Sequence, residues 1–163
     1  MAGAGRAVGD GTSACTRCDG AVREARERLS IELPRSGVTA SIEVPARRCA
    51  RCGGVEVEPP VRARAHLALA CGLADVGVET GEALRHMRKA LGLRAADLAR
   101  LLGVTPETIS HWETGKAGTS RAAFAALAAM VEDALAGRTT TRDRLAACAG
   151  GKPCPRVLSV AMR

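Results

Sequence analysis

Residues 93–116, with the sequence LRAADLARLLGVTPETISHWETGK, decide how the C-terminal half of the chain folds. Leu98, Ala99 and Leu102 recur at the spacing of one helix face, which predicts a short helix over about 95–102. Because the side chain of Ala99 is small, a following helix can cross close to this face. The pattern therefore predicts one short helix packed tightly against a second.

The next residues predict a tight turn and the start of that second helix. Gly103 can adopt a positive φ in the turn, and Val104 fills the angle between the helices. Thr105 is a favourable N-cap, and Pro106 suits the first helical position because its φ is already helical. The second helix is therefore expected over about 106–114, which makes the segment a helix-turn-helix.

The second helix has an inward and an outward face. Ile109 and Trp112 are three residues apart, so we expect both in the core. The N-terminal end of the outer face enters the DNA major groove in such motifs, which makes Glu107, Thr108 and His111 candidates for base contacts. With the candidate phosphate contacts, the predicted DNA-binding set is Arg94, Thr105, Glu107, Thr108, Ser110, His111, Lys116 and Arg121. An ordinary helical hairpin is the alternative, but the complete pattern favours DNA binding.

The motif and its surroundings, over about 83–132, resemble the Xre family, which includes the phage repressors and Cro proteins. That family commonly pairs a Glu at the end of the recognition helix with an Arg in a preceding helix, and Glu113 and Arg88 occupy those positions. Where the family often has a Gln that contacts the DNA backbone, this chain has Ala95. The resemblance implies an all-α, five-helix, lambda-repressor-like domain. Repressors of this kind bind palindromic operators as dimers, so we expect a homodimer on double-stranded DNA.

Four of the seven cysteines form two close pairs, Cys15-x-x-Cys18 and Cys49-x-x-Cys52, with 30 residues between the pairs. Four thiolates form the ligand set of a closed zinc site, so we expect one structural Zn²⁺ ion. A redox role is the weaker interpretation, because the motif occurs twice and no βαβ pattern surrounds it. Zinc would also supply folding energy to a short segment that lacks aromatic residues.

The remaining pattern predicts an α+β chain. Before residue 58, β-branched residues and the alternation of apolar with acidic residues indicate short antiparallel strands in a zinc-ribbon-like module. From Val61 the spacing of the apolar residues becomes helical. Further helices are expected over about 61–75, 81–91 and 121–136. The predicted organisation is a disordered N-terminus 1–13, a zinc-binding module 14–58, a linker helix 59–80, a helix-turn-helix domain 81–137 and a basic flexible tail 138–163. No function is assigned to Cys71, Cys148 or Cys154.

The two halves together, over roughly 15–132, resemble the MqsA family of antitoxins, whose zinc module is also called the YgiT-type zinc finger. The spacing of the cysteines is the specific part of this resemblance. It implies that the zinc module binds a toxin protein and that the helix-turn-helix domain dimerises and represses its own operon. The alternative is a stand-alone zinc-ribbon regulator without a toxin partner.

Composition limits the other classes of function. A formal net charge of +7 and a pI of about 9.5 favour an anionic partner such as nucleic acid. No signal peptide is visible and no apolar run approaches the ~20 residues that span a bilayer, so we expect a cytoplasmic protein without a membrane partner. We do not expect an enzyme: Ser110 and His111 are adjacent, point about 100° apart on a helix and cannot form a catalytic dyad.

Overall fold

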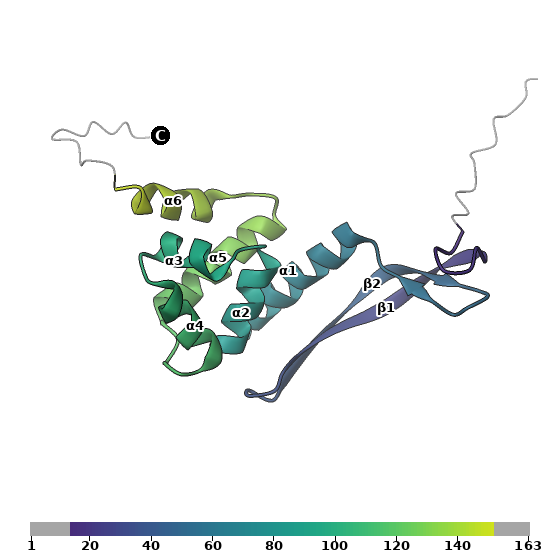
Figure 1. Cartoon of the computed structure of the whole chain (residues 1–163), viewed down its shortest axis with the longest axis horizontal. Coiled ribbons are helices and arrows are strands. Elements are labelled where there is room, and N and C mark those ends of the chain that lie inside the picture. Colours follow the sequence, from purple (N-terminus) through teal and green to yellow (C-terminus); the bar gives the residue numbers. More distant parts are fainter. Residues whose placement is uncertain (1–13, 152–163) are drawn as a thin grey trace, which may run out of the picture. The chain divides into compact units, whose positions relative to one another are not determined.

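The computed structural model describes residues 14–151, which form a three-stranded antiparallel sheet followed by six helices (Figure 1). The α+β fold class expected from the sequence is confirmed. The elements are β1 (Val22–Leu33), β2 (Val38–Cys49), β3 (Val55–Glu56), α1 (Pro59–Asp75), α2 (Gly81–Ala90), α3 (Ala95–Leu102), α4 (Pro106–Thr114), α5 (Arg121–Leu135) and α6 (Thr140–Ala149). The predictions for 1–13, for 152–163 and for Cys154 fall outside the described residues.

The described residues divide into two compact units. The first contains the residues up to Ser30 together with Ser41–Ala65, and the second contains Ile31–Ala40 together with the residues from His66 onward. The tip of the β1–β2 hairpin is therefore grouped with the helices. The domain limits proposed from the sequence stay predictions.

The first unit is built on the sheet, in the order β1-β2-β3. β3 pairs antiparallel with β2, with Arg47 opposite Glu56 and Arg48 opposite Val55. β1 and β2 have 12 residues each, which is longer than the short strands expected. The buried core of this unit consists of the small apolar side chains Val44, Ala46, Val57 and Ala65.

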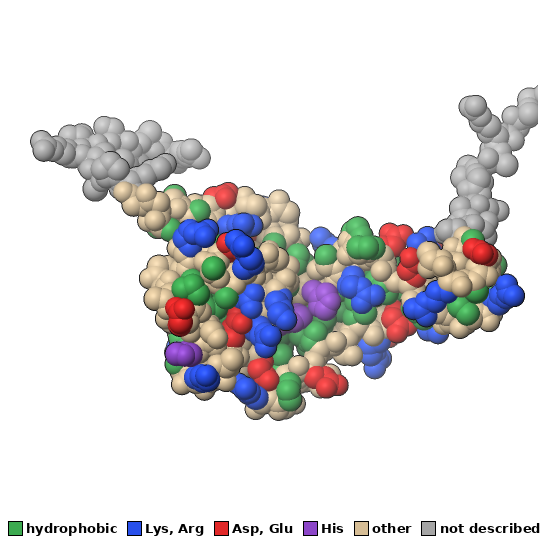
Figure 2. Space-filling view, viewed as in Figure 1, with side chains coloured by type: hydrophobic (Ala, Val, Ile, Leu, Met, Phe, Trp, Pro, Cys, Tyr) green, Lys and Arg blue, Asp and Glu red, His purple; other side chains and the backbone are tan. Residues whose placement is uncertain are grey.

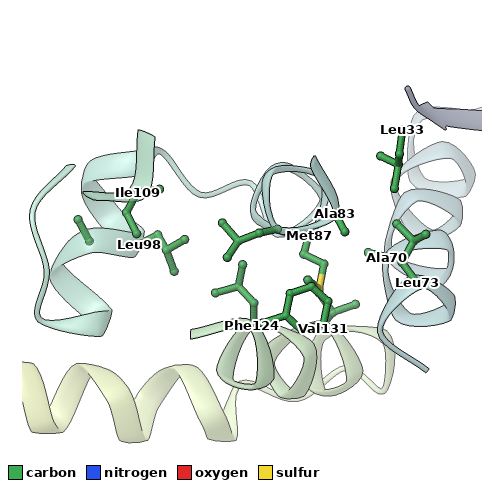
Figure 3. Close-up of a cluster of buried hydrophobic side chains, with 12 residues drawn as sticks. Leu33, Ala70, Leu73, Ala83, Met87, Leu98, Ile109, Phe124 and Val131 are labelled. Atoms are coloured by element: carbon green, nitrogen blue, oxygen red, sulfur yellow. The ribbon is translucent and has the colours of Figure 1, made fainter. Parts of the chain in front are cut away.

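The second unit is organised around a larger apolar cluster (Figure 3). Figure 3 shows side chains from several helices converging on it, with Met87, Phe124 and Val131 close together. Its largest fully buried side chains are Leu84, Met87, Leu98, Ile109, Leu127 and Val131. Phe124 is 5% exposed, so the apolar stripe of α5 packs into this core. Aliphatic burial of this extent provides the main stabilisation of a unit with so few aromatic side chains.

Two helices differ from the sequence expectation. α1 begins at Pro59, before the expected start at Val61, because proline is favourable in the first turn of a helix.

The prediction that the chain is loosely ordered from Arg138 is wrong for α6. There the Asp133 carboxylate accepts bonds from the backbone N–H and the hydroxyl of Thr141, at 2.8 and 2.7 Å, and from Arg138 Nε at 3.1 Å. These bonds hold the first turn of α6 against the end of α5.

Within residues 14–151, no helix combines the length and the apolar character required to cross a membrane.

Candidate metal centre and DNA interface

The four paired cysteines lie together, with all four sulfur atoms within 4.8 Å of one another. The Cys15 and Cys52 sulfurs are 3.7 Å apart, and the Cys18 and Cys49 sulfurs are 3.5 Å apart. A tetrahedral ion with Zn–S bonds of about 2.3 Å requires sulfurs about 3.8 Å apart. The cluster therefore has the dimensions of a four-thiolate metal site, in agreement with the ligand set predicted from the sequence.

Each cysteine pair sits in the same kind of backbone turn. The N–H of Cys15 donates to the Gly20 carbonyl at 2.9 Å, and the N–H of Cys49 donates to the Gly54 carbonyl at 2.8 Å. A Cβ on Gly20 would lie 3.0 Å from the Cys49 sulfur and 2.7 Å from the Cβ of Arg51. Glycine is therefore required beside the cluster, where the chain passes close to the sulfurs.

Backbone N–H groups also stabilise charge on the sulfurs. The N–H of Cys52 and then that of Arg51 lower the pKa of Cys49 to about 6, against the opposing effect of burial. The N–H of Arg17 similarly points at the Cys15 sulfur, at 3.5 Å. Against the lowering effect of the Gly20 backbone N–H, hydrogen bonding to Cys49 and burial raise the pKa of Cys18 to about 12, so the negative charge of this sulfur pair lies on Cys49. The thiolate is the form that binds a metal, and the turn around Cys49 favours it.

The helix-turn-helix consists of α3, the turn at Gly103 and α4. Gly103 has φ 68°, and the N–H of Thr108 donates to the Thr105 hydroxyl at 3.2 Å. Ile109 is fully buried and Trp112 is half-buried. The local geometry of the turn, the N-cap and the inward face is the geometry predicted from the sequence.

A buried ion pair connects α2 to the end of α4. Arg88 donates to both carboxylate oxygens of Glu113, with Nη2 to Oε2 at 2.9 Å, and its Nη1 donates to the Leu93 carbonyl at 2.7 Å. The two side chains are only 11% and 9% exposed, and the hydrogen bond with Glu113 raises the pKa of Arg88. This is the pair of residues that the Xre resemblance implies, and its geometry fixes α4 against α2.

The residues predicted to contact DNA lie on the surface around α3 and α4. Those exposed are Arg94, Thr105, Glu107, Ser110, His111, Lys116 and Arg121, and Thr108 is half-buried. Two of the cations already have acidic partners: Arg94 donates to Asp97 at 2.8 Å, and Arg121 lies 3.4 Å from Glu79. Most of the set lies on or beside α3 and α4, while Arg121 is the first residue of α5, and the DNA contacts of all of them stay predictions.

The electrostatics of this surface are mixed. Hydrogen bonding to Arg94 lowers the pKa of Asp97 to about 2, and the backbone N–H at the start of α4 lowers the pKa of Glu107. The face drawn in Figure 2 carries separate groups of Lys and Arg side chains with acidic side chains between them. The sequence of α4, PETISHWET, contains no Lys or Arg. Positive charge for a DNA backbone must therefore come from segments beside the recognition helix.

The tip of the β1–β2 hairpin, to which no role was assigned from the sequence, also contacts α4. The guanidinium group of Arg35, at the hairpin tip, donates from Nη1 to the carbonyl oxygen of Thr114, the last residue of α4. No local pattern could have indicated this contact, because the two residues are 79 positions apart.

Comparison with known proteins agrees with this geometry. Residues 79–132, about a third of the chain, match the family model described as a helix-turn-helix domain. This segment is similar to helix-turn-helix domains, and the match supports the resemblance to Xre-type domains noted in its sequence. Searches of curated proteins and of solved structures found no match. The domain indicates a DNA-binding regulator, and the cysteine cluster indicates a metal site.

Proposed function

We propose that the protein is a sequence-specific transcriptional repressor that binds a palindromic DNA operator as a homodimer. The observation that carries this proposal is the helix-turn-helix over α3 and α4, with a family match to the same residues. One recognition helix reads only a few base pairs, so two helices about 34 Å apart on a palindrome are needed for selectivity. The proposal is of a binding protein and not of an enzyme.

The outer face of α4 carries groups suited to direct readout. Glu107 can accept a hydrogen bond from the amino group of cytosine, and His111 can donate to or accept from a purine edge. Lys116 follows the helix and supplies a charge for phosphate, which sets register but carries no sequence information. Arg88 and Glu113 hold the helix in place and contact no base.

The cysteine cluster would hold one Zn²⁺ ion with a structural role. Four thiolates occupy all four coordination positions of a tetrahedral ion and leave none for substrate or water. The metal would therefore stabilise the fold and would not take part in catalysis. The chain's own contribution is the pair of turns that bring the four sulfurs together and lower the pKa of Cys49.

We further propose that the repressor is the antitoxin of a type II toxin–antitoxin pair, that it autoregulates its operon and that its zinc module binds the toxin. The support is the spacing of the two cysteine pairs ahead of a helix-turn-helix domain, which resembles the MqsA family. Co-expression with the product of a neighbouring gene tests this refinement. Relief of that product's toxicity and a stable complex support the antitoxin, and a neighbour that neither inhibits growth nor binds supports a stand-alone regulator.

Binding titrations at several salt concentrations test the DNA proposal, with a duplex selected from a random library and a scrambled duplex as comparison. His111→Ala should weaken the selected duplex by about 1–3 kcal/mol and relax preference at one position. Lys116→Ala should weaken both duplexes alike and reduce the salt slope by about one. Equal losses on both duplexes for His111→Ala would refute the assigned reading face, and a wild type without preference for any duplex would refute the repressor.

A further inference from the structure

The tip of the β1–β2 hairpin, Ile31–Ala40, is built into the unit that contains the helix-turn-helix. Leu33 is 5% exposed and belongs to the same buried cluster as Ala70 and Leu73 of α1 and Ala83 of α2 (Figure 3). Ile31 and two residues on the returning strand are half-buried against this cluster. Burial of this kind fixes the tip, so the residues it carries have defined positions beside α2 and α4.

Two polar contacts place Arg35 at the C-terminal end of the recognition helix. Its backbone N–H donates to the carboxylate of Glu82, at 3.3 and 3.1 Å from the two oxygens. Its Nη1 donates to the carbonyl oxygen of Thr114, and a Cβ on the next residue, Gly115, would lie 3.1 Å from the same nitrogen. The guanidinium group therefore lies against the end of α4 and remains exposed to solvent.

The charges around this end of α4 leave Arg35 available to an anion. Glu113 is neutralised by Arg88, and the Glu82 carboxylate, which keeps its charge, accepts the backbone N–H of Arg35 and forms no ion pair with its guanidinium group in the described residues. Within residues 14–151, no partner is found for Nε or Nη2 of Arg35, so most of the five guanidinium donors are free. Lys116, also exposed, follows Gly115 directly in the chain. Two cations therefore flank the end of a recognition helix that has none of its own.

We propose that Arg35 binds a phosphate of the DNA backbone beside the recognition helix, so that the hairpin tip is part of the DNA interface. This inference rests on the proposed DNA-binding function and extends the interface to the N-terminal half of the chain. A guanidinium group suits the task because its planar donors match two phosphate oxygens at once. The contact is to the backbone, so it adds affinity and register and does not select a base.

The competing interpretation is that Arg35 only stabilises the end of α4, where a cation interacts favourably with the helix dipole and a free carbonyl. Two substitutions separate the roles. Arg35→Gln removes the charge and keeps a polar side chain with N–H donors, and Arg35→Lys keeps the charge. Arg144→Gln, at an exposed arginine of α6, is the matched control because it makes the same change of charge in the same unit.

The experiment measures the affinity of the full-length variants for the selected and scrambled duplexes across a salt series, together with thermal melting. Arg35→Gln should weaken both duplexes by about tenfold at low salt, reduce the slope of log K against log salt by about 0.9 and leave the melting temperature nearly unchanged. Arg35→Lys should keep the wild-type slope, and Arg144→Gln should change neither slope nor affinity.

Three results would overturn the inference while leaving the repressor proposal intact. They are an unchanged slope for Arg35→Gln, an equal fall in slope for Arg144→Gln, and a loss that appears only as a lower melting temperature. Failure of the wild type to bind any duplex is a different outcome. It would refute the proposed function itself and this inference with it.

Discussion

The ion pair between Arg88 and Glu113 allows a quantitative test of how the recognition helix is held. Arg88→Ala removes both hydrogen bonds to the carboxylate and the bond to the Leu93 carbonyl. The carboxylate is then left 9% exposed, with Arg85 at 4.0 Å as its remaining cationic neighbour. The variant therefore leaves a buried charge with little compensation.

The expected magnitude follows from burial. Removing one partner of a buried ion pair costs about 3–5 kcal/mol, because the other charge stays desolvated. Arg85 is 55% exposed, so its remaining ion pair with Glu113 stabilises the variant only as much as a surface pair does, by about 0–1 kcal/mol. Arg88→Ala should therefore lower the free energy of unfolding by about 3 kcal/mol. Replacing both residues, as Arg88→Met with Glu113→Leu, should restore most of this loss, since neither charge then remains buried.

Urea denaturation followed by fluorescence measures this directly, because the chain has one tryptophan, Trp112, and it lies in α4. Arg94→Ala is the control, since it breaks an ion pair whose arginine is 81% exposed and should cost far less. A loss below about 1 kcal/mol for Arg88→Ala would refute the argument from burial. A double variant no more stable than Arg88→Ala would refute the argument that the unpaired charge causes the loss.

Three further predictions concern the metal, a close contact and a histidine. Metal analysis of the purified protein should find one zinc per chain. Cys49→Ser should lose the metal, while the helical circular dichroism signal largely persists. Zinc retained by that variant would exclude the four-cysteine site. Gly81→Ala should cost at least about 2 kcal/mol, because its Cβ would lie 1.9 Å from the Trp112 carbonyl oxygen. Gly72→Ala is the control, because a Cβ on Gly72 would meet no atom within 4 Å, and it should stabilise α1 by about 0.5–1 kcal/mol. Equal melting temperatures for the two variants would contradict the packing argument. Burial lowers the pKa of His86, so as the pH falls below about 6.5 the unfolded state takes up a proton before the folded state does. The free energy of unfolding should therefore fall on acidification through that range. Denaturation curves of His86→Gln should show a free energy of unfolding that depends less on pH than that of the wild type.

The parts of the fold that the sequence predicts are those determined by local chemistry. Gly103 adopts the left-handed conformation that a tight turn requires, and Thr105 caps the helix that follows it. The cysteine pairs are equally local, because a C-x-x-C turn brings its own two sulfurs together. Each of these features needs only a few neighbouring residues, so its sequence pattern is sufficient evidence for it.

The parts that the sequence does not predict depend on contacts between distant residues or on weak patterns. α6 buries none of its side chains, so it has no apolar periodicity to reveal it. Its first turn is held by Asp133, eight residues before the Thr141 that donates to it. The docking of Arg35 on Glu82 and Thr114 joins residues 47 and 79 positions apart, which no local rule connects.

These distant contacts change how the DNA-binding part of the chain is delimited. The family match begins at residue 79, yet the buried cluster beneath the motif also contains Leu33, Ala70 and Leu73. Burying a leucine side chain contributes about 2–3 kcal/mol, a large fraction of the stability of a small unit. The helix-turn-helix therefore depends on the hairpin tip for part of its core. The same tip places a cation at the end of α4, so a single segment supplies apolar side chains to the shared core and charge to the end of the recognition helix.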